Sequence, residues 1–149
     1  MVGYNSRSLL NANNLYFLQY LLASDSFDII IIVETWLSDH EVLNLKHGGY
    51  KPIHCAHQDR HGVSIICRSR FDVSEIFPEF SHGELLMVKI NCKPENLIVA
   101  VLYTTPGHSD HARTMRHFST AMEHLKQRFS SFSMLAFTDF NRDFRKPTP

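Results

Sequence analysis

The chain has 149 residues, 44% hydrophobic and 20% charged, which suits one packed domain and excludes a disordered chain. Fifteen Lys and Arg balance fifteen Asp and Glu, which counts against a protein that coats DNA through overall positive charge. No segment has the length of a membrane span or the pattern of a signal peptide. The three cysteines, Cys55, Cys67 and Cys92, are odd in number and form no C-x-x-C motif, so we expect free, mostly buried thiols in a reducing, intracellular compartment. We expect no membrane partner.

The chain begins with the pattern of a strand followed by a helix. Residues 2–5 predict a short strand that ends at the polar Asn5. Asn13 or Asn14 can cap a helix, whose apolar residues recur at helical spacing: Leu15, Leu18 and Leu22. Polar residues 24–26 end this helix.

The run 29–33 is the most apolar stretch of the chain and predicts a central strand. It contains only Ile and Val, which is typical of a strand buried on both faces of a sheet. Glu34 follows it directly, where ligand sites lie in α/β sheets. Glu34 is therefore either an exposed turn residue or a functional carboxylate, and the position alone does not decide between them.

The middle of the chain alternates in hydrophobicity with period two. Ser38 and Glu41 have capping-box spacing, so we expect a short helix over 42–45. Short polar connections separate the next runs, which indicates antiparallel strands. The four predicted strands are residues 50–57, 63–68, 84–92 and 96–103.

A second long helix and a last strand close the pattern. Apolar residues at spacings of three and four predict a helix over 110–129. Residues 133–138 predict a strand, which we expect to be left as a bare apolar edge. The basic, proline-tipped segment 142–149 is expected to be a disordered tail.

Polar residues stand at or beside several of these strand ends. Each has an ordinary structural explanation, such as a turn residue or a core tyrosine with a satisfied hydroxyl. The set consists of Asn5, Glu34, Tyr103, Asp139 and Asn141.

Taken together, these residues resemble the endonuclease/exonuclease/phosphatase superfamily with the DNase-I-like fold, and more narrowly the endonuclease domain of non-LTR retrotransposons. The resemblance extends from Asn5 to Asn141. The matching segments are Asn5-x-Arg7-Ser8-Leu9, Asp28 to Leu37, Gly49-Tyr50, Asp59-Arg60 with Gly62-Val63, Val101-Leu102-Tyr103 with Pro106, and Thr138-Asp139-Phe140-Asn141.

The resemblance implies a role for each polar residue. Glu34 is similar to the metal-binding glutamate and Asn5 to the asparagine beside it, so the resemblance implies that both residues hold the metal. Tyr103 is similar to a tyrosine that contacts the scissile phosphate. Asp139 is similar to the aspartate that orients or deprotonates water, and Asn141 to its partner. Mg²⁺, or Mn²⁺ in its place, is the implied cofactor, since hard cations bind carboxylate oxygens and phosphate.

The resemblance also implies an α/β fold with mixed sheets, a four-layer sandwich formed by residues 1–141 and incomplete at its C-terminus. The family's last strands, with their phosphate-stabilising histidine, have no counterpart here. Ser109-Asp110-His111 has the letters of the family's terminal tripeptide, but its position favours a helix N-cap. A zinc site from His54, His57 and His61 is disfavoured, because His54 and His57 point to opposite faces of a strand.

Three functions are compatible with this sequence. The first is a Mg²⁺-dependent endonuclease that nicks target DNA for reverse transcription, with duplex DNA as partner, a monomeric chain and a nuclear location. The second is an inactive remnant of such an element. The third is a phosphatase for a small phosphorylated substrate. Because the family's histidine is missing, we expect the isolated chain to be nearly inactive, since one lost oxyanion donor costs about 10²–10³ in rate.

Overall fold

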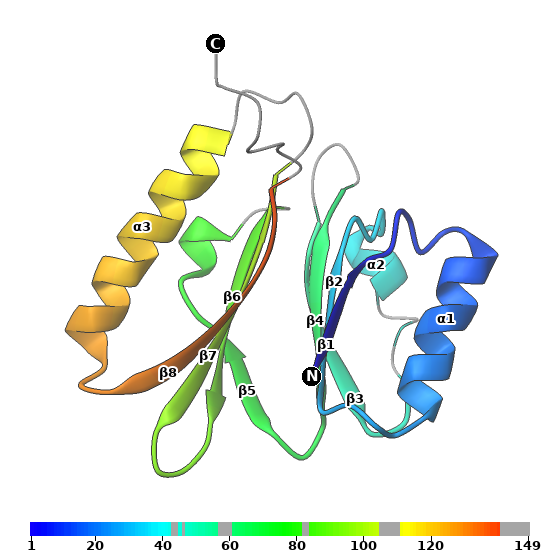
Figure 1. Cartoon of the computed structure of the whole chain (residues 1–149), viewed down its shortest axis with the longest axis horizontal. Helices are drawn as coiled ribbons and strands as arrows, with labels where there is room; N and C mark the ends of the chain where they lie inside the picture. The colour runs from blue at the N-terminus through cyan, green and yellow to red at the C-terminus, as the bar shows by residue number, and fades with distance from the viewer. Residues whose placement is uncertain (43–44, 46, 57–60, 82–83, 105–110, 141–149) are drawn as a thin grey trace.

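The computed structural model describes residues 1–42, 45, 47–56, 61–81, 84–104 and 111–140. These residues form two four-stranded sheets that pack face to face (Figure 1). Helices α1 and α2 cover the outer face of one sheet, and α3 covers the outer face of the other. The predicted mixed α/β sandwich of four layers is confirmed.

The first sheet has the strand order β1-β2-β4-β3. Strand β1 (Val2–Asn5) pairs in parallel with β2 (Ile29–Val33), and the crossover between them contains α1 (Ala12–Ala23). The other pairs are antiparallel, with β4 (Val63–Arg68) between β2 and β3 (Tyr50–Cys55). The predicted strand 50–57 therefore ends two residues early, and His57 lies outside the described residues.

The second sheet has the strand order β5-β6-β7-β8. Strands β6 (Leu85–Asn91) and β7 (Asn96–Tyr103) form the predicted antiparallel pair. Strand β8 (Phe132–Asp139) pairs in parallel with β7, and α3 (His111–Arg128) forms the crossover. At the other edge, β5 (Asp72–Glu75) was not predicted, because only one of its four residues is apolar. A 3₁₀ turn, Pro78–Phe80, follows it.

Two helix boundaries differ from the prediction. The N-cap of α1 is Asn11, whose side chain accepts from the Asn13 backbone N–H at 2.9 Å, so neither Asn13 nor Asn14 is the cap. The short helix α2 spans Asp39–Val42. Its capping box is confirmed, because Glu41 Oε2 accepts from the Ser38 backbone N–H at 2.8 Å. No helix in the described part of the chain is long and apolar enough to cross a membrane.

Three hydrophobic clusters hold the layers together. One lies between the sheets, and each of the other two lies between a sheet and its helices. Strand β2 contributes to two of them: Ile31 and Val33 face the opposite sheet, while Ile30 and Ile32 face α1. Because both faces are covered, every residue of β2 is buried, which explains its uninterrupted apolar sequence.

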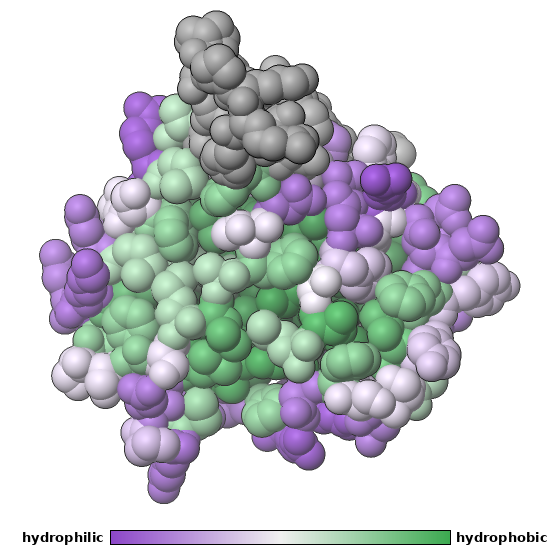
Figure 2. All heavy atoms as spheres, viewed as in Figure 1, coloured by the Kyte–Doolittle hydropathy of each residue, from purple (hydrophilic) through white to green (hydrophobic). Residues whose placement is uncertain are grey.

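The sandwich is apolar along one side. Strands β1 and β8 are the edge strands of their sheets, and both lie on the face shown in Figure 2, which is hydrophobic in the middle and polar at its margins. Among the described residues, no strand pairs with the outer edge of β8. Leu135 on β8 is 40% exposed. Within the described part of the chain, β8 is therefore an unpaired edge with a partly exposed apolar side chain.

Candidate active site

Four of the five predicted site residues lie together at one end of the sandwich. Asn5 ends β1, Glu34 follows β2, Tyr103 ends β7 and Asp139 ends β8. Because β1 runs parallel to β2 and β7 runs parallel to β8, each pair of strands brings its carboxyl ends to one edge. The packing of the two sheets then places the two edges opposite each other. The fifth residue, Asn141, lies outside the described residues.

The side-chain amide of Asn5 joins the two carboxylates. Its Nδ2 donates to Glu34 Oε1 at 2.6 Å and to Asp139 Oδ2 at 3.1 Å. The backbone N–H of Arg7 donates to Asn5 Oδ1 at 2.9 Å, which fixes the orientation of the amide. Both hydrogens of the Asn5 amide therefore serve carboxylates from different sheets.

Tyr103 supplies a second uncharged donor to the same glutamate. Its hydroxyl donates to Glu34 Oε1 at 2.8 Å, and the side chain is 1% exposed. Burial raises the pKa of Tyr103 well above its usual value, and the hydrogen bond to Glu34 and the nearby carboxylates raise it further. Tyr103 is thus a phenol, and a hydrogen-bond donor, throughout the neutral pH range.

A buried carboxylate that the sequence did not single out supports the end of β7. Glu84 is 3% exposed, and its Oε2 accepts from the Thr114 hydroxyl of α3 at 2.8 Å. Its backbone carbonyl accepts from the Tyr103 N–H at 2.8 Å. Its charge is one of those that raise the Tyr103 pKa. Glu84 therefore links α3 to the strand end that carries Tyr103.

The loops that carry the site contain strained backbone. Glu34 and Trp36 have φ angles of 54° and 59°, and Arg7 and Ser8 have φ angles of 47° and 85°. Each left-handed non-glycine residue costs about 1–3 kcal/mol and persists only where its surroundings hold it. The Glu34 carbonyl is held by the Ser6 hydroxyl and the Ser8 N–H, both at 2.8 Å. These contacts aim the Glu34 side chain at the opposite sheet.

The His61 ring lies beside Tyr103, and the Trp36 ring lies beside His61. The His61 ring lies 5.9 Å from the Tyr103 ring and 5.1 Å from the Trp36 ring, measured between centroids. The His61 carbonyl also accepts from the Trp36 N–H at 3.0 Å. From the sequence, His61 was considered only for the disfavoured zinc site.

The structure gives no support for zinc. His54 Nδ1 lies 2.7 Å from Ser64 Oγ, and His54 Nε2 lies 3.1 Å from the Leu37 carbonyl, so both ring nitrogens have partners. Burial lowers the pKa of His54. Among the described residues there is no group of three His, Cys, Asp or Glu side chains that could hold a metal ion. Structural zinc needs four such ligands.

The carboxylate pair fits a different kind of cation. Glu34 uses Oε1 for both of its hydrogen bonds, so Oε2 is the oxygen left for a cation. Two charged carboxylates joined by one neutral amide repel each other, and a cation between them would remove that repulsion. Mg²⁺ needs only one or two carboxylates and keeps several waters. The donor set is therefore compatible with Mg²⁺ or Mn²⁺.

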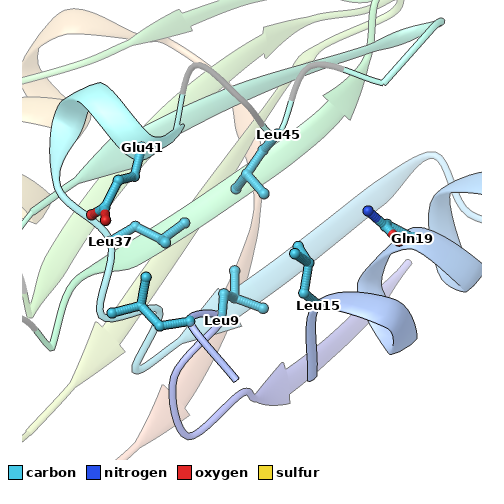
Figure 3. Close-up of a pocket in the computed structure, with 7 residues that line it drawn as sticks. Leu9, Leu15, Gln19, Leu37, Glu41 and Leu45 are labelled. Atoms are coloured by element: carbon cyan, nitrogen blue, oxygen red, sulfur yellow. The ribbon is translucent and has the colours of Figure 1, made fainter. Parts of the chain in front are cut away.

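A pocket on the other side of the first sheet is separate from this constellation. Figure 3 shows it between α1 and the segments that follow β1 and β2, with Leu9, Leu15, Gln19, Leu37, Glu41 and Leu45 among its lining residues. Its leucines belong to the cluster that packs against α1, whereas Tyr103 belongs to the cluster between the sheets. The pocket is thus not the predicted site.

The sequence alone matches no protein-family model and no curated protein. Solved structures do match. The endonuclease domain of TRAS1, a telomere-specific non-LTR retrotransposon, has a TM-score of 0.71 at 15% identity over 97% of this chain and 60% of its own. The 3′-5′ exonuclease NExo from Neisseria meningitidis has a TM-score of 0.63 at 19% identity, over 94% and 57%.

The AP endonuclease LMAP from Leishmania major has a TM-score of 0.60 at 16% identity, over 90% of this chain and 53% of its own. This chain therefore spans little more than half the length of these three structures. All three are nucleases of the DNase-I-like superfamily. The chain has the DNase-I-like fold.

Proposed function

We propose that this chain carries the cation-binding half of a phosphodiesterase site that acts on DNA. The observation that supports this most is the Asn5 amide, which joins Glu34 of one sheet to Asp139 of the other. A carboxylate pair held by one neutral donor is an arrangement suited to a hard cation and a phosphate. A structural turn would not need residues from four strand ends.

In this proposal Glu34, through Oε2, and Asp139 are the residues that would hold the cation. Bound there, it would neutralise charge on the phosphoryl oxygens. Asp139 accepts a proton from the attacking water as the new P–O bond forms. The bond from phosphorus to the 3′ oxygen breaks, and the leaving oxygen takes a proton from a solvent water, which leaves a 3′-hydroxyl and a 5′-phosphate. Asn5 and Tyr103 redirect their hydrogens to phosphate oxygens, which compete with the carboxylates as acceptors.

Arg7 gives the site a positive charge next to Asn5. It is exposed on the loop after β1, and its backbone N–H holds the Asn5 amide. An exposed arginine beside a carboxylate pair suits a nucleic-acid backbone, because guanidinium binds phosphate in a bidentate manner. For the related fold, one NExo structure is described as bound to a product DNA hairpin.

We further propose that the substrate is the target DNA of a retrotransposon. The sequence Glu34-Thr35-Trp36-Leu37 resembles that branch, and the TRAS1 endonuclease has a higher TM-score than NExo or LMAP. The second candidate is a non-catalytic remnant. It is favoured by β8, where Leu135 is 40% exposed and no described strand pairs with the outer edge.

A plasmid-nicking assay with Mg²⁺ and with Mn²⁺ separates these candidates. It compares the wild type with Glu34→Ala, Asp139→Ala and the matched control Glu79→Ala, since Glu79 is exposed and lies in the 3₁₀ turn. Nicking that both site variants abolish and the control retains supports the nuclease. Mg²⁺ binding without nicking supports the remnant. Turnover of inositol or sugar phosphates without nicking would contradict the choice of DNA.

A further inference from the structure

Gly3 of β1 and Phe137 of β8 touch across the gap between the two sheets. A Cβ atom placed on Gly3 would lie 2.4 Å from both Cδ2 and Cε2 of the Phe137 ring. Carbon atoms in ordinary contact are about 3.5–4.0 Å apart, so a side chain at Gly3 has no room. The φ angle of Gly3 is not in the left-handed region, so space rather than backbone conformation requires glycine here.

This contact lies two residues before the candidate site on both strands. Gly3 is two residues before Asn5, and Phe137 is two residues before Asp139. Residues i and i+2 of a strand point to the same face. Gly3 and Asn5 therefore lie on one face of β1, and Phe137 and Asp139 on one face of β8, each facing the opposite sheet. Gly3–Phe137 and Asn5–Asp139 are therefore successive cross-sheet pairs, roughly 7 Å apart along the strands.

The neighbouring strands confirm that both pairs are aligned. Gly3 and Asn5 pair with Ile31 and Val33 of β2, which belong to the cluster between the sheets. On the other side, Phe137 and Asp139 pair with Val101 and Tyr103 of β7, which belong to the same cluster. The Gly3–Phe137 pair is thus a hydrophobic contact at the end of the inter-sheet core, directly beneath the polar pair.

We propose that Gly3 and Phe137 are positioning residues that set the distance between Asn5 and Asp139. The large ring fills the space that the glycine leaves, so the separation of β1 and β8 is determined at this step. The strands keep that separation two residues further on, where Asn5 Nδ2 donates to Asp139 Oδ2 at 3.1 Å. This inference rests on the proposed function for its importance to cation binding, but the geometry does not depend on it.

The test uses Gly3→Ala, which adds one methyl group against the ring. Gly48→Ala is the matched control, because a Cβ at Gly48 meets no atom within 4 Å. The double variant Gly3→Ala/Phe137→Leu is the rescue, because the smaller side chain restores room for the methyl group. Urea unfolding and circular dichroism of each variant establish that it folds.

The first readout is the side-chain amide signal of Asn5 in ¹⁵N-edited NMR spectra, assigned by its loss in Asn5→Ala. We expect Gly3→Ala to shift this signal, Gly48→Ala to leave it unchanged and the double variant to return it towards the wild-type position. The second readout is Mg²⁺ affinity by titration calorimetry. We expect Gly3→Ala to weaken it about tenfold, since changes to residues that orient metal ligands typically cost about 10–100-fold.

The outcomes distinguish the two proposals. An Asn5 signal that is unmoved in a folded Gly3→Ala protein would overturn the positioning inference. A moved signal, together with a wild type that binds no Mg²⁺, would leave the positioning inference standing and overturn the proposed function. If Gly3→Ala alone does not fold, the comparison of Phe137→Leu with the double variant carries the test. Identical Asn5 signals in these two proteins would then contradict the inference.

Discussion

Asn5 Nδ2 lies 3.1 Å from Asp139 Oδ2, although 134 positions separate the two residues in the sequence. One ends the first strand of the chain and the other ends the last. The hydrogen bond therefore forms only when both sheets are complete and packed against each other. The site belongs to the whole sandwich rather than to any one motif.

Replacing Glu34 by Gln should remove most of the Mg²⁺ affinity. Gln keeps the shape of the side chain and an oxygen to accept from Tyr103, but it removes the charge that a hard cation requires. In a thermal-shift titration, Mg²⁺ should raise the melting temperature of the wild type and not that of Glu34→Gln. Glu79→Gln is the control and should respond as the wild type does. Equal responses of all three proteins would refute the assignment of Glu34 as a ligand.

Replacing Tyr103 by Phe should change stability in a pH-dependent way. The hydroxyl donates to a carboxylate, and such bonds contribute about 1.5–3 kcal/mol, so the free energy of unfolding should fall by that order at pH 7. Because the folded-state pKa is raised, the Tyr103 contribution is fully present below pH of about 10, the usual tyrosine value. It is lost as pH rises above that value, since only the unfolded chain then releases the proton.

The wild type should therefore lose stability above pH 10 more steeply than Tyr103→Phe. Urea unfolding at a series of pH values measures both slopes. Tyr16→Phe is the control, because Tyr16 is 67% exposed on α1. Burial also raises the pKa of Tyr4, so Tyr4 should contribute to the loss of stability at high pH in every variant. Parallel slopes for Tyr103→Phe and the wild type would contradict the prediction.

Replacing Ser6 by Ala should weaken the site more than the fold. The hydroxyl contacts the carbonyls of Val33 and Glu34, but each carbonyl keeps a backbone N–H donor, so the stability cost should be only about 1 kcal/mol. The left-handed conformation of Glu34 is then less well held, and Mg²⁺ affinity should fall. Calorimetry measures the affinity and urea unfolding the stability. Ser74→Ala, on exposed β5, should change neither.

The three thiols should differ strongly in reactivity. Burial raises the pKa of both Cys55 and Cys67 to about 12, and Cys67 is fully buried, whereas Cys92 is exposed. Since the thiolate is the reactive form, a thiol reagent near pH 8 should modify Cys92 first. Mass spectrometry of a labelling time course identifies the site. A fast reaction that persists in Cys92→Ser would show that the core opens more readily than the structure indicates.

Replacing Leu135 by Lys should reduce self-association. Residues 132–138 contain no charge and no proline, so β8 lacks the side chains that usually protect an edge strand. Leu135 is 40% exposed, so a lysine there can reach solvent at a cost of less than about 1 kcal/mol. Light scattering over a range of concentrations measures the effect. A wild type that stays monomeric at every concentration would remove the reason for this change.

Local sequence patterns predicted most elements of the fold, because each depends on its own hydrophobic period. The run 29–33 is buried on both faces as predicted. The apolar residues of α3 pack in the cluster between this helix and the second sheet. Strand β5 could not be predicted from periodicity, since its residues Asp72–Glu75 are mainly polar and its pairing with β6 is what makes it a strand.

The site residues that were predicted are those that lie at strand ends and also match the motifs of the family. Asn5, Glu34, Tyr103 and Asp139 were found in this way, and the structure brings them together. His61, Glu84 and the pair Gly3–Phe137 were not recognised, because their contacts join segments that are distant in the sequence. A glycine that is required for space in one sheet cannot be recognised without knowing which side chain the other sheet places against it.

Among the described residues, each outer hydrophobic cluster belongs to a single sheet and its own helices, and one cluster spans both sheets. A small sliding motion between the sheets would therefore leave each half's own helix packing and backbone pairing intact. It would still separate Asn5 from Asp139. Partial opening of this kind is common below the global unfolding transition. Mild denaturant should consequently abolish cation binding while the circular dichroism spectrum still shows every helix and strand.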